Sequence, residues 1–202
     1  MAQAAKLDLY KKHRSEYVTP KSPVFVRIGP ARYLAIAGTG APGGEQFQAS
    51  ISALYAVAFT LKMTEKFAGH DYKVCHLEGQ WWADGGCDFR KLDPKEVRWK
   101  LLIRIPTFLT QKKVDAAVQS VIQKGKAPLA NQIRMETLAE GRCVQVLHTG
   151  PYAEESPTLE KMYAFAQGAG VEVRGPHHEI YLSDPRKVAP EKVRTILRYP
   201  VK

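Results

Sequence analysis

The segment Val144-Gln-Val-Leu-His-Thr-Gly150 opens a unit that occurs twice in this 202-residue chain. It predicts a strand, after which come a loop, an amphipathic helix and a strand carrying Glu179. In the first half, Tyr33-Leu-Ala-Ile-Ala-Gly38 begins the same series, which ends in a strand carrying Glu78. Identity between the halves is low, so the order of elements is what indicates an internal duplication. We therefore predict an α+β fold in which two pseudo-symmetric strand-helix-strand-strand repeats form a curved antiparallel sheet with helices and a central cleft.

Three amphipathic helices are predicted from apolar residues at three- and four-residue spacing. The first begins at Glu45 and reaches about Phe67. The second follows Thr110, whose side chain suits an N-cap, and the third runs from about Ser156 to Gly168. Each has one apolar face, so each is expected to pack inward.

Short β-rich runs bounded by glycine, proline and aspartate predict the strands. They cover residues 24–28, 33–37, 72–77, 99–105, 171–173 and 179–182. Residues 133–138 and 142–147 are predicted to form a hairpin around Glu140-Gly141. The proline-capped segment 190–198 is predicted to be a short helix or turn.

The chain is predicted to be one domain preceded by a polar extension. Residues 1–23 form the extension, with a short helix around 7–16, and prolines 20 and 23 mark the entry to the body. The domain spans 24–202, with repeats at about 24–105 and 106–202. The first residues lack an apolar secretory core, and no stretch approaches the roughly 18 apolar residues of a membrane span. A cytoplasmic protein without membrane contact is expected.

The net charge of +10 raises the question of nucleic acid, because lysine and arginine neutralise phosphates. The basic residues are scattered, however, and no block of them alternates with aromatic residues. A solvated basic surface is the simpler interpretation. We expect a small-molecule ligand as the partner, with nucleic acid disfavoured and a protein partner left open.

Cysteine and histidine spacing favours neither a disulfide framework nor a metal site. Cys75, Cys87 and Cys143 form an odd set without a CxxC pair. Cys75 and His76 are neighbours, and neighbours on a strand point to opposite faces, so they do not suit a thiol–imidazole couple. The histidines lack the spacing of a metal site with a third ligand; they are His148, His177 and His178. No metal and no cofactor are expected.

Glu179 stands in a strand that is otherwise apolar and aromatic. Period-2 alternation places Glu179 and Tyr181 on one face, and Ile180 and Leu182 on the other. Because the apolar pair should face the core, Glu179 and Tyr181 should face a cavity or solvent. An edge strand with a solvated acid fits the same pattern.

The second half contains His148-Thr-Gly-Pro-Tyr152, then Pro176-His-His-Glu-Ile-Tyr-Leu-Ser-Asp-Pro185, then Pro190-Glu-Lys-Val-Arg-Thr-Ile-Leu-Arg198. The first half adds Glu45-Gln-Phe-Gln48 and Leu77-Glu-Gly-Gln-Trp-Trp82. From about residue 24 to 201 the chain resembles the GyrI-like small-molecule-binding family, in its stand-alone branch.

The resemblance implies two repeats around a central cleft, a fold that also serves as the effector-binding domain of multidrug-responsive transcription activators. In those domains a buried glutamate among aromatic residues receives lipophilic cations, and Glu179 matches that acid by position. Some stand-alone members hydrolyse cyclopropane-bearing genotoxins. The family therefore includes both binding proteins and hydrolases.

The candidate site combines these arguments. Glu179 is the principal acid, and Tyr152 is a second catalytic candidate that would orient a ligand or assist proton transfer. The ligand-binding candidates are Glu78, as the pseudo-symmetric acid, together with Trp81, Trp82, Tyr55, Phe59, Tyr181 and Met162. Adjacent tryptophans on a strand face opposite ways, so only one of Trp81 and Trp82 should line the cleft.

Two functions from different classes remain open. One is binding of lipophilic, planar or cationic xenobiotics, with cofactor-independent hydrolysis of cyclopropane-type electrophiles as a further activity. The other is a regulatory effector-binding or gyrase-inhibitor-like interaction protein without catalysis.

Overall fold

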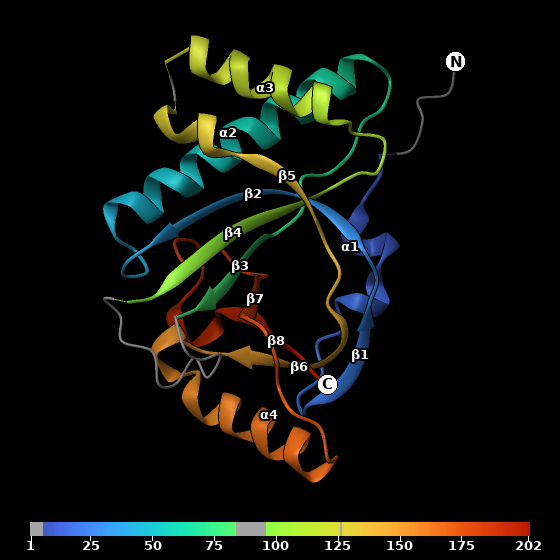
Figure 1. Ribbon diagram of the computed structural model, residues 1–202, viewed down its shortest axis with the longest axis vertical. Helices are drawn as coiled ribbons and strands as arrows, with labels where there is room; N and C mark the ends of the chain where they lie inside the picture. Colours follow the sequence, from blue (N-terminus) through green and yellow to red (C-terminus); the bar gives the residue numbers. More distant parts are fainter. Residues whose placement is uncertain (1–5, 84–95, 126) are drawn as a thin grey trace.

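The structure is a computed structural model that describes residues 6–83, 96–125 and 127–202. In the described chain, eight strands form one antiparallel sheet in the order β1-β6-β8-β7-β3-β4-β2-β5. Their bounds are β1 Val24–Ile28, β2 Ala31–Thr39, β3 Leu77–Trp82, β4 Arg98–Ile105, β5 Arg134–Leu138, β6 Gly141–Thr149, β7 His177–Tyr181 and β8 Arg194–Pro200. The predicted α+β fold with a curved antiparallel sheet is confirmed (Figure 1).

The sheet is symmetric about its centre, where β3 pairs with β7. On one side the order is β3, β4, β2, and on the other it is β7, β8, β6. The first strand of each set, β2 or β6, is followed along the chain by a long helix. The seam between the repeats is therefore the β3–β7 pair, which aligns Gly79 with Glu179.

The two outermost strands are exchanged between the repeats. β1 precedes β2 in the chain but pairs with β6, and β5 precedes β6 but pairs with β2. The predicted hairpin of residues 133–147 is therefore wrong. The short link at Glu140 carries the chain across to the other repeat's half of the sheet, and Gly29-Pro30 does the same after β1. These crossings tie the two halves together covalently and by hydrogen bonds.

All three predicted long helices are confirmed. They are α2 Glu45–Phe67, α3 Gln111–Gln123 and α4 Ser156–Gly168, and the Thr110 hydroxyl accepts a hydrogen bond from the Lys113 backbone N–H at 3.4 Å. Short helical turns complete the described chain: α1 Leu9–Lys12, η1 Arg14–Glu16, η3 Pro128–Gln132, η4 Tyr152–Glu154 and η5 Pro190–Lys192. None of the helices in the described ranges has both the length and the apolar character of a membrane span.

Two strand predictions and one helix-or-turn prediction need correction. β3 begins at Leu77, where the predicted strand 72–77 ends, and residues 171–173 contribute a single bridge from Val173 to Val201. The segment predicted as a helix or turn at 190–198 contains β8, a central strand. Six of its seven residues are buried, so it lacks the alternation that marks a half-exposed strand.

The three long helices pack on one face of the sheet, called here the helix face. Figure 1 shows α2 and α3 at one end of the sheet and α4 at the other. The α2 and α3 core contains buried residues of β2 and β4, such as Leu34 and Leu101. The α4 core contains Val146 of β6 and Leu197 of β8. The β3–β7 pair lies between these two cores, at the centre of the sheet.

The opposite face carries a buried polar network around His178. Its Nδ1 lies 2.8 Å from Oε1 of Glu140, and its Nε2 lies 3.1 Å from Oε2 of Glu78. Arg198 donates from Nη1 to Oε2 of Glu140 at 3.0 Å. Burial disfavours the imidazolium, but the two carboxylates outweigh it and raise the pKa of His178 to about 9. His178 is therefore a cation held between two acids.

The residues that precede β1 cover this network. Tyr17, which is buried, donates from its hydroxyl to Oε1 of Glu78 at 3.1 Å. Arg104 donates to Oε2 of Glu16 at 2.7 Å and to the Tyr17 hydroxyl at 3.2 Å. The described part of the predicted polar extension thus packs against the sheet and shields the charges of the network from water.

Replacing His178 by leucine should destabilise the fold strongly. The substitution leaves Glu78 and Glu140 buried without their shared cation, which should cost about 3–5 kcal/mol of unfolding free energy. In the wild type, the pKa of His178 rises from its ordinary 6.5 to about 9 on folding. Its contribution is therefore complete below pH 6.5, is lost as pH rises through 9, and amounts to about 3 kcal/mol.

Urea denaturation at pH 6.5 and pH 9 measures both effects. His70→Gln is the control, because the His70 side chain is 61% exposed. A wild-type stability that stays level across this pH interval would contradict the charged state assigned to His178.

Candidate functional site

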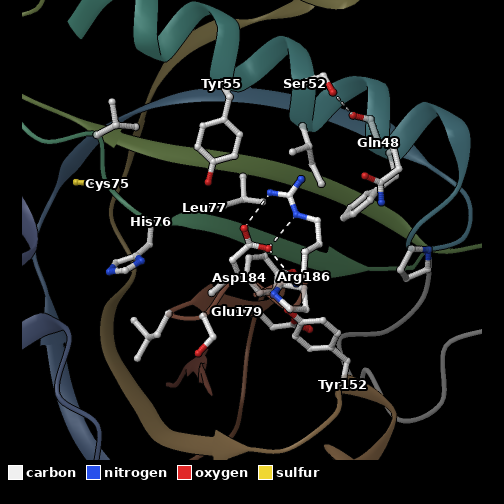
Figure 2. Close-up of a pocket in the computed structure, with 18 of the residues that line it drawn as sticks. Gln48, Ser52, Tyr55, Cys75, His76, Leu77, Tyr152, Glu179, Asp184 and Arg186 are labelled. Carbon is white, nitrogen blue, oxygen red and sulfur yellow. Dashed lines mark hydrogen bonds and ion pairs between the residues drawn. The ribbon is translucent and has the colours of Figure 1, made fainter. Parts of the chain in front are cut away.

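A cavity of about 1040 Å³ lies over the β3–β7 seam on the helix face. Its roof comes from α2, its floor from β3 and β7, and its rim from the loop that follows β7 (Figure 2). The cavity thus lies between α2 and the centre of the sheet. The predicted central cleft therefore lies at the seam of the repeats.

Glu179 lies on the floor of the cavity and is only 4% exposed. Its Oε1 lies 3.2 Å from Nε2 of His177. The Tyr181 hydroxyl also hydrogen-bonds to Glu179, and burial followed by this carboxylate raises the pKa of Tyr181 well above its ordinary value. Tyr181 thus stays protonated and donates to Glu179.

Gly79 provides the space for this arrangement. A Cβ at position 79 would lie 2.7 Å from the Tyr181 hydroxyl and 3.0 Å from Nε1 of Trp81. With glycine in place, Trp81 donates from Nε1 to the Tyr181 hydroxyl at 3.2 Å. The hydrogen bonds that link Trp81, Tyr181 and Glu179 therefore depend on glycine at position 79.

Glu155 is a second acid of the cavity that sequence reasoning missed. Glu154 and Glu155 are neighbours just before α4, where acidic residues are usually explained by the positive end of the helix dipole. In the structure Glu154 is exposed, whereas Glu155 is 2% exposed and lines the cavity. Helix periodicity could have indicated that Glu155 is buried. Counting on from Glu155, the buried positions of α4 follow at spacings of four, three and four residues: Leu159, Met162 and Ala166.

Glu155, His177 and Glu179 form one cluster. One ligand-type atom from each lies within 4.8 Å of the others, and all three residues are buried. Two carboxylates and an imidazole are a donor set that suits a divalent transition metal ion such as zinc or manganese. The spacing argument, which considered His148, His177 and His178 together, did not include this combination.

Aromatic side chains form the walls. The rings of Tyr55 and Phe59 stack at 6.0 Å on α2, and Phe47 packs against Trp81 at 5.5 Å. Tyr152 meets Tyr181 edge-on at 5.8 Å, and burial and Glu179 raise the pKa of Tyr152 to about 12. A planar ligand can contact several ring faces at once.

An ion pair closes part of the rim. Arg186 donates to both oxygens of Asp184 at 2.9 Å, and these hydrogen bonds lower the pKa of Asp184 to about 2. Figure 2 shows the pair lying between Tyr55 and Tyr152.

The structure brings most of the predicted residues together. Those lining the cavity are Glu179, Tyr152, Tyr181, Trp81, Tyr55 and Phe59. The choice between the two tryptophans is resolved, because odd-numbered residues of β3 face the cavity and even-numbered ones do not.

Three predicted ligand-binding residues lie elsewhere. Glu78 is on the opposite face, where it contacts His178, because even-numbered residues of β3 point away from the cavity. Trp82 is also an even-numbered residue of β3, and it does not line the cavity. Met162 is fully buried in the core beneath α4, where it packs the helix against the sheet, and it does not line the cavity.

Cys75 lines the cavity but is not a suitable nucleophile. Burial and then the charge of Glu78 raise the pKa of its thiol to about 12, so the thiolate is scarce at neutral pH. Cys75 and Cys143 are both free thiols, and Cys87 lies outside the described residues.

Comparison with known proteins identifies the family. The model of the GyrI-like small molecule binding domain matches residues 21–202. The chain belongs to this family. Comparison with curated protein sequences gives no match.

Two solved structures from Listeria innocua resemble this GyrI-like chain over nearly its whole length. An uncharacterized conserved protein is 34% identical, covers 98% of this chain and 100% of its own, and has a TM-score of 0.90. A protein described as a hydrolase is 33% identical with the same coverage and a TM-score of 0.88.

The C-terminal domain of EcmrR is 10% identical, with 90% of this chain and 97% of that domain covered and a TM-score of 0.59. This likeness shows that the fold is shared.

Gly79→Ala should disturb the cavity floor. The added methyl group cannot fit without moving Tyr181 or Trp81, so we expect a loss of about 1–3 kcal/mol in unfolding free energy. Gly168→Ala is the control, since its Cβ would meet no atom within 4 Å, and its effect should stay within about 1 kcal/mol. Urea denaturation followed by tryptophan emission compares the two. Equal stability of both variants would show that Tyr181 moves aside freely.

Proposed function

We propose that this GyrI-like protein binds lipophilic planar or cationic small molecules in the seam cavity, with Glu179 as the counter-charge. The observation that carries the proposal is a carboxylate that is 4% exposed on the floor of a cavity walled by aromatic rings. The volume of about 1040 Å³ lies at the upper end of the range for drug-sized ligands. Ring faces attract cations by about 0.5–2 kcal/mol each.

The distribution of charge supports a cationic ligand despite the net charge of +10. The basic residues that line the cavity are paired with acids at its rim: Lys73 with Asp8 at 3.6 Å, and Arg186 with Asp184. Glu155 and Glu179 lie deeper, without a lysine or arginine partner among the described ion pairs. The interior of the cavity is therefore acidic.

Tetraphenylphosphonium, a permanently charged aromatic cation, provides the test. It should quench tryptophan emission, because Trp81 lines the cavity. Glu179→Gln removes the counter-charge and should raise the Kd at least about tenfold, or 1.4 kcal/mol. Triphenylphosphine oxide, which is neutral, should bind both forms within about twofold.

Glu154→Gln is the matched control, because Glu154 is an exposed acid close to the same cavity. Unchanged tetraphenylphosphonium affinity in Glu179→Gln would exclude the electrostatic role of Glu179.

Hydrolysis of cyclopropane-type electrophiles is a second candidate function. It is favoured by the two acids at the base of the cavity and by the 33% identity to the Listeria innocua hydrolase. In a cyclopropane conjugated to a carbonyl, water attacks a ring carbon, a ring C–C bond breaks, and its electron pair moves to the carbonyl oxygen, which takes up a proton. Such addition of water requires a base at the water and an acid at the oxygen. Glu179 can act as the base, and the protonated Tyr152 hydroxyl is one proton donor in reach of the cavity.

Turnover of a cyclopropane-fused cyclohexadienone, followed as gain of one water by mass spectrometry, tests this activity. Glu179→Gln should lower kcat by at least about 100-fold, and Tyr152→Phe should have a smaller effect. Glu154→Gln should retain the wild-type rate. Binding without turnover would favour the alternative, a regulatory effector-binding or gyrase-inhibitor-like interaction protein.

A further inference from the structure

Glu155 and Glu179, which are both buried, approach each other from different elements at the base of the cavity. Glu155 immediately precedes α4, and Glu179 lies in β7. Neither is more than 4% exposed, and both belong to the cluster whose ligand-type atoms lie within 4.8 Å. Two carboxylates this close in a low-dielectric site cannot both be ionised without a cation between them.

The surroundings distinguish the two acids. Glu179 lies 3.2 Å from His177 Nε2 and accepts a hydrogen bond from the Tyr181 hydroxyl, so it has polar partners on two sides. Oε1 of Glu155 is buried and has no hydrogen-bond partner among the described residues. A carboxylate left in that state costs far more free energy than a neutral acid does. Burial and then Glu179 raise the pKa of Glu155 well above its ordinary value.

Among the described residues, the other groups around the pair do not supply a fixed positive charge. Tyr152 from η4 and Tyr181 from β7 remain neutral, and the ring of Tyr199 from β8 packs on His177 at 4.8 Å. Arg186 at the rim pairs with Asp184, and Lys73 pairs with Asp8.

We propose that Glu155 is a neutral carboxylic acid at neutral pH and forms a single-proton pair with ionised Glu179. The base of the cavity then offers one negative charge and one O–H donor. This inference rests on the proposed function and sharpens the ligand class: a singly charged cation, or a polarised neutral molecule, that carries a hydrogen-bond acceptor such as a carbonyl oxygen near its apolar body.

In the proposed hydrolysis, the two acids of the pair take different roles, one as the base and one as the acid. Glu179 takes a proton from the attacking water as the new C–O bond forms, and Glu155 gives its proton to the carbonyl oxygen as the ring C–C bond breaks. The net change is addition of one water, and transfer of the proton from Glu179 to Glu155 restores the pair.

Carbon-13 NMR of protein labelled at the glutamate side-chain carboxyl group tests the protonation state without any ligand. At pH 7 we expect one glutamate in the acid form. That signal should be absent in Glu155→Gln and present in the matched control Glu154→Gln. In Glu179→Gln the titration of Glu155 should move to lower pH, because a neighbouring negative charge is removed.

The wild-type spectrum alone is decisive, so the test does not depend on a variant that folds. Ionisation of every glutamate at pH 7 would overturn the proposal. A stoichiometric divalent ion found by elemental analysis of the same sample would also overturn it, because the cluster would be a metal site.

Tetraphenylphosphonium titration provides a second readout. Because glutamine is a neutral substitute for a protonated glutamate, Glu155→Gln should keep the wild-type Kd within about threefold, whereas Glu179→Gln should lose at least about tenfold. A tenfold loss in Glu155→Gln would mean that Glu155 is ionised, which contradicts the proposal. Failure of the wild type to bind the cation would count against the proposed function alone, since the NMR result stands by itself.

Discussion

The antiparallel pairing of β3 with β7 is the constraint on which the rest of the structure depends. It joins the two repeats, and its register aligns Gly79 with Glu179 on the helix face. The pleat then assigns every neighbouring side chain to one of two faces. Trp81, Glu179 and Tyr181 face the cavity, while Glu78 and His178 face the covered polar network. A shift of one residue in this register would exchange the two sets.

The two faces treat buried charge in opposite ways. On the covered face, His178 lies between two acids and Arg198 completes the pairing of Glu140, so the network is compensated and stabilises the fold. On the helix face, the described residues place no comparable cation beside Glu155 and Glu179, and both acids line the cavity. An uncompensated buried acid is a structural cost that a ligand can remove, which is why the second cluster suits binding and the first suits stability.

Family membership and cavity geometry contribute different information. The GyrI-like match and the two Listeria innocua structures establish the family and its fold over nearly the whole chain. They leave the ligand open, as does the likeness to the EcmrR domain. The proposed ligand class follows instead from the side chains, because an acidic cavity lined by aromatic rings favours flat, apolar, positively charged ligands over anions.

The sequence by itself determined the repeat order, all three long helices and the face of Glu179, because these follow from periodicities within one element. It could not assign the exchange of β1 and β5, since a link of two residues suits a hairpin as well as a crossing to the other repeat. It also missed β8, whose burial on both faces removes the alternation that marks a strand. Only the tertiary structure decided that Glu155 meets Glu179 and that Glu78 does not, because the distance between side chains on different elements depends on the strand register and the position of α4, which no local pattern encodes.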